Sequence, residues 1–595
     1  MAIGNLSAMK ALRLVQFQIR WAVLAFLVHY SFAHAEPNNS ATVNISLSNS
    51  VAKQQLLSSA ERLSKNPNNR MELIANAFIA AQVLNDGSTS DALRIAALRH
   101  FTKSAHGIPE LGEKLSKLFR HRIELRNLVE EGTKQLQLEL SRPKKERDAE
   151  IVEGLLRIVQ FAKNETTAID AVDLGEITVG ELFSNFEEMA NIGPPSLNFI
   201  QALLSSDEAL MFYLVESPSV YLWVVRSFDV QFFELGISSD ELRVSVTNLR
   251  TGLDLTGVSN LFDIPRFDDD LAYEMYKKLW HPAKSYLSDV EHILLVLDGE
   301  LTSFPFGVLL QEPAQGVPYS KMDWLAKRHS MSVLPSVSSL PFLRDLGPGY
   351  SKAPKPFIGF GDPELNGSSG SKVTASASEM QSGGLFANPR ALDKLPALPN
   401  TARELGAIAN LLGAGSHSLF LRTQATEAQV KEMDLSQFRT IAFATHALVA
   451  DELSEVSPPG LVLSPPSKAT LKDDGFLSSW EIQGLNLDAD LVILSACNTA
   501  ASDGSPGAQA LSGLAKSFFY AGARRLLVSH WSVETSAAER IVEEFFVVVE
   551  QNPTIGFSTA LKRSMAKMIG DSRENPSHTH PAFWAPFILV GDGHP

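Results

Sequence analysis

The first third of the chain carries apolar residues at the spacing of an amphipathic helix. Leucines recur every seven residues at Leu111, Leu118 and Leu125. Charged residues lie off this stripe, as in a helix with one apolar face. Pro143 interrupts the pattern because proline disfavours helical backbone at the preceding residue, and residues 151–161 resume it. We predict a helical hairpin or repeat-like region over residues 51–190. It is either a packing layer or a partner-binding array, and no clean 34-residue repeat supports full tetratricopeptide repeats.

Short β-rich runs replace the helical spacing from about residue 195 onward. They lie at residues 212–215, 220–225, 230–235, 292–297, 331–334 and 357–360. Residues 239–253 have the pattern of a helix between them. We interpret residues 195–365 as a first α/β half that lacks catalytic residues. Residues 366–385 are rich in Gly, Ser and Ala and have little to bury, so we expect a flexible loop.

Helices and strands alternate through the second half, residues 386–595. Predicted strands lie at residues 440–444, 491–494, 526–529 and 586–590. Predicted helices lie at residues 401–412, 426–433, 508–520 and 537–550. Gly522 is expected to end the third helix. This alternation is typical of a mostly parallel sheet with helices on both faces.

The amino terminus has the pattern of an export signal. Basic residues at Lys10, Arg13 and Arg20 precede a short apolar run, residues 21–32, which ends in Ala33-His34-Ala35. Small residues in this arrangement are typical of a signal-peptidase site. We expect a signal peptide over residues 1–35, a flexible lead-in over residues 36–50, and a periplasmic or secreted protein. The apolar run is short for a membrane span, although an uncleaved anchor is the alternative; after signal removal no integral span is expected.

Composition narrows the chemistry. The net charge of −15 argues against a broad nucleic-acid surface. The single cysteine, Cys497, excludes an intramolecular disulfide and a cysteine-rich zinc site. No P-loop or Gly-x-Ser-x-Gly motif is present, and His578 and His580 lack the carboxylates of a metal site. We expect no cofactor and no metal.

Two predicted strands end in residues with reactive side chains. His446 follows the strand at 440–444, and Cys497 follows the strand at 491–494. Neighbouring parallel strands bring their carboxyl ends to one edge of a sheet, where such folds carry their sites. An imidazole there can accept the thiol proton or stabilise the thiolate. The separation of 51 residues is close to that in caspases. Each residue alone could be structural, but the pair favours a catalytic dyad.

Several segments resemble the CHAT family, whose caspase-like domains occur beside tetratricopeptide repeats. The matching stretches are ATHA (444–447), DGFL (474–477), ADLVILSACNT (489–499), AGARR (521–525), SHWSV (529–533) and HPAFWAPF (580–587). The resemblance covers about residues 195–593 and implies a first α/β half without a dyad followed by a caspase-like half. It also implies an oxyanion hole from the backbone amides of Ala447 and Cys497. Caspase-like enzymes commonly have glycine where this chain has Ala447, which loses the freedom to adopt a positive φ.

The resemblance also points to a substrate pocket. Separase-like relatives carry an acid that accepts arginine in a place similar to that of Glu534, which follows Trp531. Asp473 and Asp474 lie between the dyad strands and are further candidates. A carboxylate pairs most tightly with the planar guanidinium group, so we predict cleavage after a basic residue. Alternatively, Glu534 is a solvated acid favoured by the dipole of the following helix.

These observations favour an exported cysteine endopeptidase of the caspase-like clan that acts on a protein or peptide substrate. His446 and Cys497 would form the dyad without a third member. The alternative is a non-catalytic CHAT-fold scaffold whose helical amino-terminal region binds a protein partner.

Overall fold

The structure is a computed structural model that describes most of the chain. Apart from short gaps, the described residues are 49–85, 149–172, 194–255, 264–345, 351–365, 395–448, 459–495, 513–571, 575–593 and parts of 122–147. They fall into two compact units. The predicted signal peptide (1–35), nearly all of the lead-in and the predicted loop at 366–385 lie outside the described residues. Among the helices described, none is long and apolar enough to cross a membrane.

The smaller unit is helical. Its helix α6 (Ala149–Asp170) buries Leu155, Val159 and Ala162 at helical spacing. Leu125, from the seven-residue leucine pattern, is also buried in this part of the chain. Arg122 fastens the end of α6, since its Nε lies 2.6 Å from Asp170 Oδ1. The helical prediction is thus confirmed for the described part of this region.

The larger unit is built on one sheet of eleven strands. Their order is β3-β2-β1-β4-β5-β14-β13-β12-β8-β6-β7. Seven neighbouring pairs are parallel, and the pairs β3-β2, β2-β1 and β14-β13 are antiparallel. The predicted fold class, a mostly parallel sheet flanked by helices, is confirmed.

In the described part of residues 195–345, the first half contains five strands of the sheet and four α-helices. The strands are β1 (Glu208–Glu216), β2 (Ser219–Val225), β3 (Val230–Ser238), β4 (His292–Val296) and β5 (Ser330–Leu334). The helices are α8 (Leu197–Leu203), α9 (Ser239–Thr251), α10 (Asp269–Leu279) and α11 (Ser339–Asp345). A helical hairpin, α2 (Asn49–Ser64) and α3 (Arg70–Asn85), packs here, with Phe78 6.1 Å from Phe212 between ring centroids.

The second half supplies the remaining strands. They are β6 (Lys355–Pro363), β7 (Leu419–Arg422), β8 (Phe438–Ala444), β12 (Leu491–Leu494), β13 (Arg525–Ser529) and β14 (Phe587–Gly591). A small antiparallel sheet contains β9 (Ala447–Leu448), β10 (Gly460–Val462) and β11 (Phe476–Ser478). The helices are α13 (Asn400–Leu411), α14 (Glu427–Glu432), α15 (Ser479–Gly484), α16 (Gly513–Ala521), α17 (Thr535–Gln551), α18 (Phe557–Gly570) and α19 (Pro581–Trp584).

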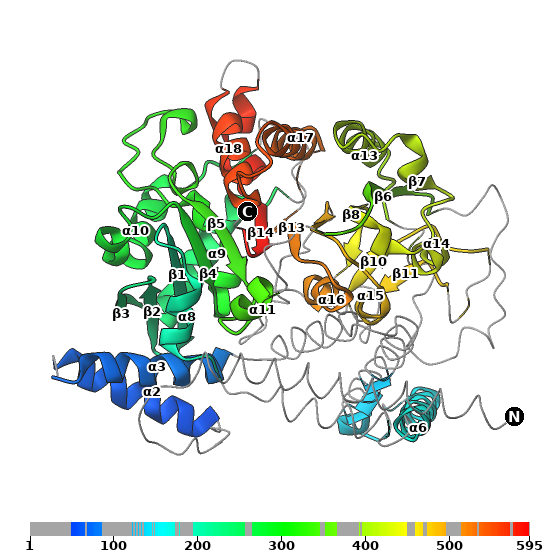
Figure 1. Cartoon of the computed structure of the whole chain (residues 1–595), viewed down its shortest axis with the longest axis horizontal. Coiled ribbons are helices and arrows are strands. Elements are labelled where there is room, and N and C mark those ends of the chain that lie inside the picture. Colours follow the sequence, from blue (N-terminus) through cyan, green and yellow to red (C-terminus); the bar gives the residue numbers. More distant parts are fainter. Residues whose placement is uncertain are drawn as a thin grey trace, which may run out of the picture. The chain divides into compact units, whose positions relative to one another are not determined.

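Helices cover both faces of the sheet. Figure 1 shows α13, α17 and α18 along one side and α8, α11, α15 and α16 along the other. The strands buried between them are almost wholly apolar, as β12 illustrates with the sequence LVIL and four buried positions, which is typical of a parallel strand covered on both faces. Gly522 ends α16 as predicted. Its φ is +109°, and a Cβ there would lie 2.5 Å from the Leu487 carbonyl oxygen.

The last strand, β14, joins the two halves. It runs parallel to β5 and antiparallel to β13, so the strands of the two halves point in opposite directions. The carboxyl ends of β8, β12 and β13 therefore share one edge of the sheet, and those of β4 and β5 lie at the other. A single hydrophobic core runs through both halves, so the halves predicted from sequence form one folded unit.

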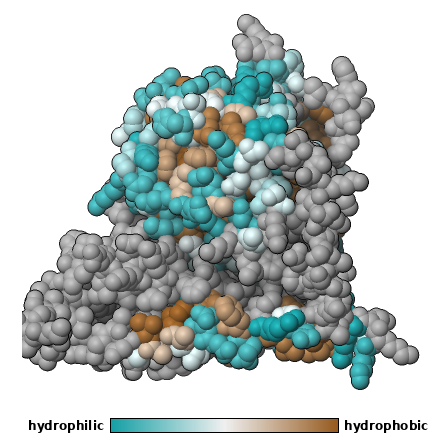
Figure 2. Space-filling view, turned by 90° about the vertical axis from the view of Figure 1, so that its right-hand side faces the viewer, coloured by the Kyte–Doolittle hydropathy of each residue, from teal (hydrophilic) through white to brown (hydrophobic). Residues whose placement is uncertain are grey.

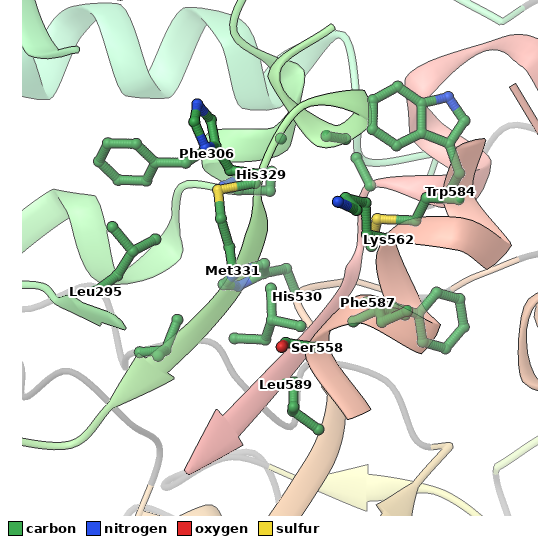
Figure 3. A pocket seen from close by; sticks show the side chains of 18 of the residues that line it. Leu295, Phe306, His329, Met331, His530, Ser558, Lys562, Trp584, Phe587 and Leu589 are labelled. Carbon is green, nitrogen blue, oxygen red and sulfur yellow. The ribbon is translucent and has the colours of Figure 1, made fainter. Parts of the chain in front are cut away.

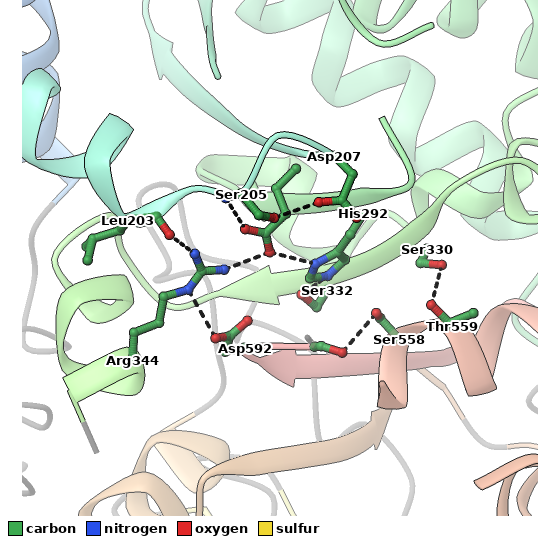
Figure 4. Close-up of polar contacts among 12 residues, drawn as sticks. Leu203, Ser205, Asp207, His292, Ser330, Ser332, Arg344, Ser558, Thr559 and Asp592 are labelled. Carbon is green, nitrogen blue, oxygen red and sulfur yellow. Dashed lines mark hydrogen bonds and ion pairs between the residues drawn. The ribbon is translucent and has the colours of Figure 1, made fainter. Parts of the chain in front are cut away.

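A buried ionic cluster fastens β14 to the first half (Figure 4). Arg344 Nη2 donates to Glu208 Oε1 at 2.7 Å, and its Nε donates to Asp592 Oδ2 at 3.2 Å, directly after β14. Arg344 also donates to the carbonyl of Leu203. The Ser205 backbone N–H donates to Glu208 Oε2 at 2.9 Å. One arginine thus links α8, α11, β1 and the carboxyl-terminal strand.

The strand β7 forms one edge of the sheet, and its features oppose pairing with a further strand. Figure 2 looks onto the side of the molecule that carries β7 and α14, where apolar residues are framed by hydrophilic ones. Leu419, Phe420 and Leu421 in β7 are half-buried, and the strand ends at the exposed Arg422. Short edge strands that end in a charge resist edge-to-edge association.

Candidate active site

The predicted neighbours β8 and β12 are adjacent and parallel. Leu494 pairs with Phe443 at the end of the register, and the Ser495 backbone N–H donates to the Phe443 carbonyl at 3.0 Å. Residues after these two strands therefore emerge at the same edge. His446 lies two residues beyond β8. Cys497 lies two residues beyond Ser495 in sequence and falls outside the described residues.

His446 is held by a backbone carbonyl. Its Nε2 lies 2.7 Å from the carbonyl oxygen of Pro396, and the side chain is buried. A carbonyl oxygen only accepts hydrogen bonds, so Nε2 carries the proton. In a neutral imidazole Nδ1 is then the free acceptor. The hydrogen bond to Pro396 thus fixes the orientation of the ring and leaves Nδ1 as the nitrogen without a proton.

The small sheet keeps the Pro396 carbonyl in place. The Val462 backbone N–H donates to the His446 carbonyl at 2.8 Å, and Thr445 Oγ1 donates to the Val462 carbonyl. Val462 and Phe476 form a separate apolar cluster, against which Leu395 packs. Because Leu395 precedes Pro396, this cluster positions the carbonyl that binds His446.

Ala447 does not occupy a position that requires glycine. It lies in β9, paired with Leu461 of β10. Among the described residues other than glycine, a positive φ occurs only at Gln315, Asp362 and Arg422. The Cβ of Ala447 therefore carries no conformational cost, and the conflict expected from the family's glycine does not arise in the described conformation.

A buried carboxyl group lies beside the end of β12. Glu404 of α13 is only 3% exposed, and the Ser495 hydroxyl donates a hydrogen bond to it. Its Oε1 has no hydrogen-bond partner among the described residues. Burial raises the pKa of Glu404 to about 7, against the lowering effect of Ser495 and with a further increase from nearby Glu539.

The raised pKa predicts a pH-dependent stability. A carboxyl group with pKa near 4.5 unfolded and about 7 folded favours the folded state at low pH, and this contribution is lost as pH rises through 7. Glu404→Gln should therefore be more stable than the wild type at pH 8, by about 3 kcal/mol at 1.36 kcal/mol per pH unit, and nearly equal to it at pH 4.5. Urea unfolding between pH 4.5 and 8 measures this. Glu432→Gln, at an exposed position of α14, is the control, and a parallel pH profile for both variants would contradict the prediction.

The predicted pocket acids Asp473 and Asp474 lie in the loop before β11. Asp474 Oδ1 accepts from the Phe476 backbone N–H at 2.8 Å, so this carboxylate stabilises its own turn. The backbone N–H groups of Asp474 and Gly475 donate to Glu427 Oε2 at 2.8 and 3.1 Å. Burial raises the pKa of Asp473. The contact with Phe476 gives Asp474 a structural role, and the role of both acids in substrate binding stays a prediction.

The remaining predicted pocket residues follow β13, which is parallel and adjacent to β12. Trp531 is fully buried, and its indole N–H donates to the Ala582 carbonyl at 3.0 Å. Arg250 lies 5.6 Å from its ring centroid. Glu534 lies outside the described residues. The edge to which β13 leads is the one that carries His446, and the roles of Trp531 and Glu534 in substrate binding stay predictions.

Sequence reasoning missed Pro396, Glu404 and Ser495. Any residue has a backbone carbonyl, so the sequence could not indicate that the carbonyl of Pro396 binds His446. The sequence could have indicated the burial of Glu404, because this residue precedes the buried Ile408 by four residues on α13 and so occupies a core-facing position. Within the described ranges no group of three or more His, Cys, Asp or Glu side chains could hold a metal ion.

The fold is that of an α/β protein with a large mixed sheet. The candidate active site lies at the edge of this sheet where the parallel strands β8 and β12 end and where His446 lies. The CHAT domain family matches residues 269–592, more than half of the chain. The chain therefore belongs to the CHAT domain family, as the motifs predict.

Sequence comparison finds a distant human relative. Tetratricopeptide repeat protein 28 of Homo sapiens is 25% identical over an alignment of 326 residues that covers 50% of this chain. The match spans only 12% of the length of that human protein.

The solved structures that this chain resembles include two weakly similar proteinases. One is the Arg-specific cysteine proteinase gingipain R, with a TM-score of 0.31 and 12% identity over 60% of this chain and 74% of that one. The other is Saccharomyces cerevisiae separase in complex with securin, with a TM-score of 0.39 and 10% identity over 91% of this chain and 47% of that one.

Proposed function

We propose that this protein is a cysteine endopeptidase whose dyad is His446 and Cys497. One observation carries the proposal: β8 and β12 are parallel neighbours, and Ser495 N–H donates to Phe443 O where they end. Cys497 follows two residues later. The hydrogen bond from His446 Nε2 to Pro396 O supports it, because it leaves Nδ1 available as a base.

The proposed reaction needs only these groups and water. His446 Nδ1 accepts the Cys497 thiol proton, and the thiolate sulfur bonds to the carbonyl carbon of the scissile peptide. Backbone N–H groups of Ala447 and Cys497 stabilise the oxyanion; one such donor is worth about 3–4 kcal/mol. The imidazolium returns its proton to the departing amine as the C–N bond breaks. Water then hydrolyses the thioester and regenerates the thiol.

The direct test is labelling with a thiol-reactive peptidyl probe. Because Cys497 is the only cysteine, every labelled molecule reports on that residue. We expect labelling that His446→Ala suppresses and that an added peptide substrate slows. Labelling that neither change affects would favour the alternative function, a CHAT-fold scaffold without catalysis.

We further propose that cleavage follows a basic residue, with Glu534 as the carboxylate that pairs with it. Glu534→Gln should lower kcat/KM for substrates with arginine before the scissile bond by more than about tenfold, or 1.4 kcal/mol. A peptide library with each residue at that position measures the preference. Glu543→Gln, an exposed acid in α17, is the control. Efficient cleavage after aspartate with Glu534→Gln silent would contradict the proposal.

We also propose export to the periplasm or the cell exterior. Expression with the native leader should yield a mature chain that begins near Glu36, after Ala33-His34-Ala35, because small residues at these positions suit signal peptidase. Amino-terminal sequencing of the fractionated protein measures this. Residues 1–35 still attached to protein in the cytosolic fraction would refute export.

A further inference from the structure

The small cavity in the first half of the sheet is a packing void of the hydrophobic core (Figure 3). It lies between β4, β5, β14 and α18, and its volume is about 60 Å³, less than half of the ~150 Å³ that accommodates benzene. Phe306, Trp584 and Phe587 contribute aromatic rings to its mostly apolar wall. Buried charges that could act on the candidate active site lie instead in the second half, next to the small sheet.

Three charged side chains form what we call the Lys431 cluster: Glu427 and Lys431 of α14, and Glu481 of α15. Lys431 Nζ contacts Glu427 Oε1 and lies 2.6 Å from Glu481 Oε1. The side chain of Glu427 is only 1% exposed, and the other two residues are half-buried. One ammonium group thus joins two helices through their carboxylates.

The two carboxylates of the cluster hold both ends of β11. Glu427 Oε2 accepts the backbone N–H groups of Asp474 and Gly475, directly before this strand, at 2.8 and 3.1 Å. Glu481 Oε2 accepts the backbone N–H of Ser478, the last residue of β11, at 2.9 Å. The Lys431 cluster therefore fixes β11 against α14 and α15.

The strand β10 connects β11 to Ala447. It pairs with β11 on one side and, on the other, with β9, which contains Ala447. The Val462 backbone N–H donates to the His446 carbonyl at 2.8 Å. Successive residues of an antiparallel strand point their backbone groups alternately toward and away from the partner strand, so the Ala447 N–H points away from β10. The pairing of β9 with β10 therefore does not use this N–H.

We propose that the Lys431 cluster positions the Ala447 N–H as a donor of the oxyanion hole, an inference that rests on the proposed endopeptidase function. The three side chains are positioning residues, because they act through β11 and β10. A donor of this kind stabilises the transition state only when it lies within hydrogen-bond distance of the developing oxyanion. A shift of β9 would therefore lower kcat while leaving the thiol and His446 in place.

The charge balance of the cluster depends on Lys431. Burial and the charge of Glu481 raise the pKa of Glu427, whereas Lys431 and the Asp474 N–H oppose this increase. Without the ammonium group the two carboxylates would repel each other, and protonation of Glu427 would become more favourable. A protonated carboxyl group binds backbone N–H groups more weakly than a carboxylate does, so β11 would be held less firmly.

Inhibition by a peptide aldehyde with the sequence of a cleaved substrate tests the proposal. The Cys497 thiol adds across the aldehyde C=O bond, with sulfur on carbon and the proton on oxygen, and this oxygen lies where the oxyanion forms. Alkylation by iodoacetamide, in which sulfur displaces iodide, forms no such oxygen and reports on the thiol alone. We expect Lys431→Met to lower kcat and weaken aldehyde binding at least about tenfold, with KM and the alkylation rate within about twofold of the wild type.

Two further variants separate charge from shape. Lys431→Arg keeps the positive charge and should retain most of the aldehyde affinity. Glu427→Gln keeps an acceptor oxygen without the charge and should show a smaller loss than Lys431→Met; it replaces that variant if Lys431→Met does not fold. Glu432→Gln is the control, because Glu432 is an exposed residue of α14, and it should match the wild type.

Wild-type kcat and aldehyde affinity in both Lys431→Met and Glu427→Gln would overturn this inference. Equal fold losses in kcat, aldehyde affinity and alkylation rate would also overturn it, because they would indicate general damage to the site. Both results leave the proposed function intact as long as the wild type cleaves peptides. A wild type that neither cleaves peptides nor binds the aldehyde would overturn the proposed function and this inference together.

Discussion

We expect Cys497→Ala to abolish peptide cleavage and His446→Ala to lower kcat/KM at least about 10²-fold, the lower range for a positioned acid–base group. These are the largest functional effects we expect. The cysteine variant loses the nucleophile itself. The histidine variant would lose both the proposed base that accepts the thiol proton and the proposed acid that protonates the amine. Initial rates on a fluorogenic peptide with arginine before the scissile bond measure both losses.

Alkylation kinetics provide a second measurement that needs no substrate. A free cysteine has a pKa near 8.5, and a neighbouring imidazolium favours the thiolate. Iodoacetamide should therefore react with Cys497 faster in the wild type than in His446→Ala at pH 7. Since the chain has one cysteine, the mass of the alkylated protein reports on this site alone.

His417→Ala is the matched control, because His417 is an exposed histidine in the same half. It should retain wild-type cleavage and alkylation. Unimpaired turnover by Cys497→Ala would reject the dyad. Equal alkylation rates in the wild type and His446→Ala would show that the two side chains do not meet.

Arg344→Met costs about 3–5 kcal/mol of the free energy of unfolding, because it leaves an unpaired buried charge. Its partner Glu208 has a side chain only 1% exposed, and Arg344 Nη2 lies 2.7 Å from Glu208 Oε1. Burial by itself would raise the pKa of Glu208. The hydrogen bonds with His292 and Arg344 nevertheless hold this pKa well below its usual value of 4.5. Urea unfolding at pH 7 measures the loss.

The pH dependence of this loss has a definite sign. A carboxyl group with a depressed folded pKa stabilises the protein above its unfolded pKa, and the contribution is lost as pH falls below that value. The difference between the wild type and Arg344→Met should therefore be full at pH 7 and shrink below about pH 4.5. The additional variant Glu208→Gln should restore part of the stability, since it removes the buried charge of Glu208.

Arg328→Met is the control for Arg344→Met. Arg328 pairs with Asp323 at the surface, with 59% of its side chain exposed, and exposed pairs contribute only about 0–1 kcal/mol. Equal losses for the two arginine variants would show that the cluster in Figure 4 does not stabilise β14. If Arg344→Met does not fold, Arg344→Lys, which retains one charge, should give an intermediate loss.

Sequence patterns predicted the central strands correctly because a strand that is buried on both faces appears in the sequence as a continuous apolar run. The run at 491–494 is wholly apolar and coincides with β12. The sequence patterns did not predict two elements, α10 and β7. The helix α10 (Asp269–Leu279) begins with acidic residues and buries only one face, while β7 has three half-buried residues and the exposed Arg422. The four residues of β7 are too few to carry a periodic signal, whereas α10 buries Ala272, Met275 and Leu279 at helical spacing, a signal that the sequence reading overlooked.

By itself, the sequence determined the family, the alternating α/β class and the placement of His446 at a strand end. Each of these can be predicted from residues that are close together in the sequence, namely the family motifs, the apolar runs and the turn residues between them. The tertiary structure decided that β14 joins both halves in one sheet, that Pro396 O holds His446, and that Glu404 reaches Ser495. These contacts join residues distant in sequence. Hydrophobic patterning specifies which residues are buried, but only the packing of elements determines which buried groups meet.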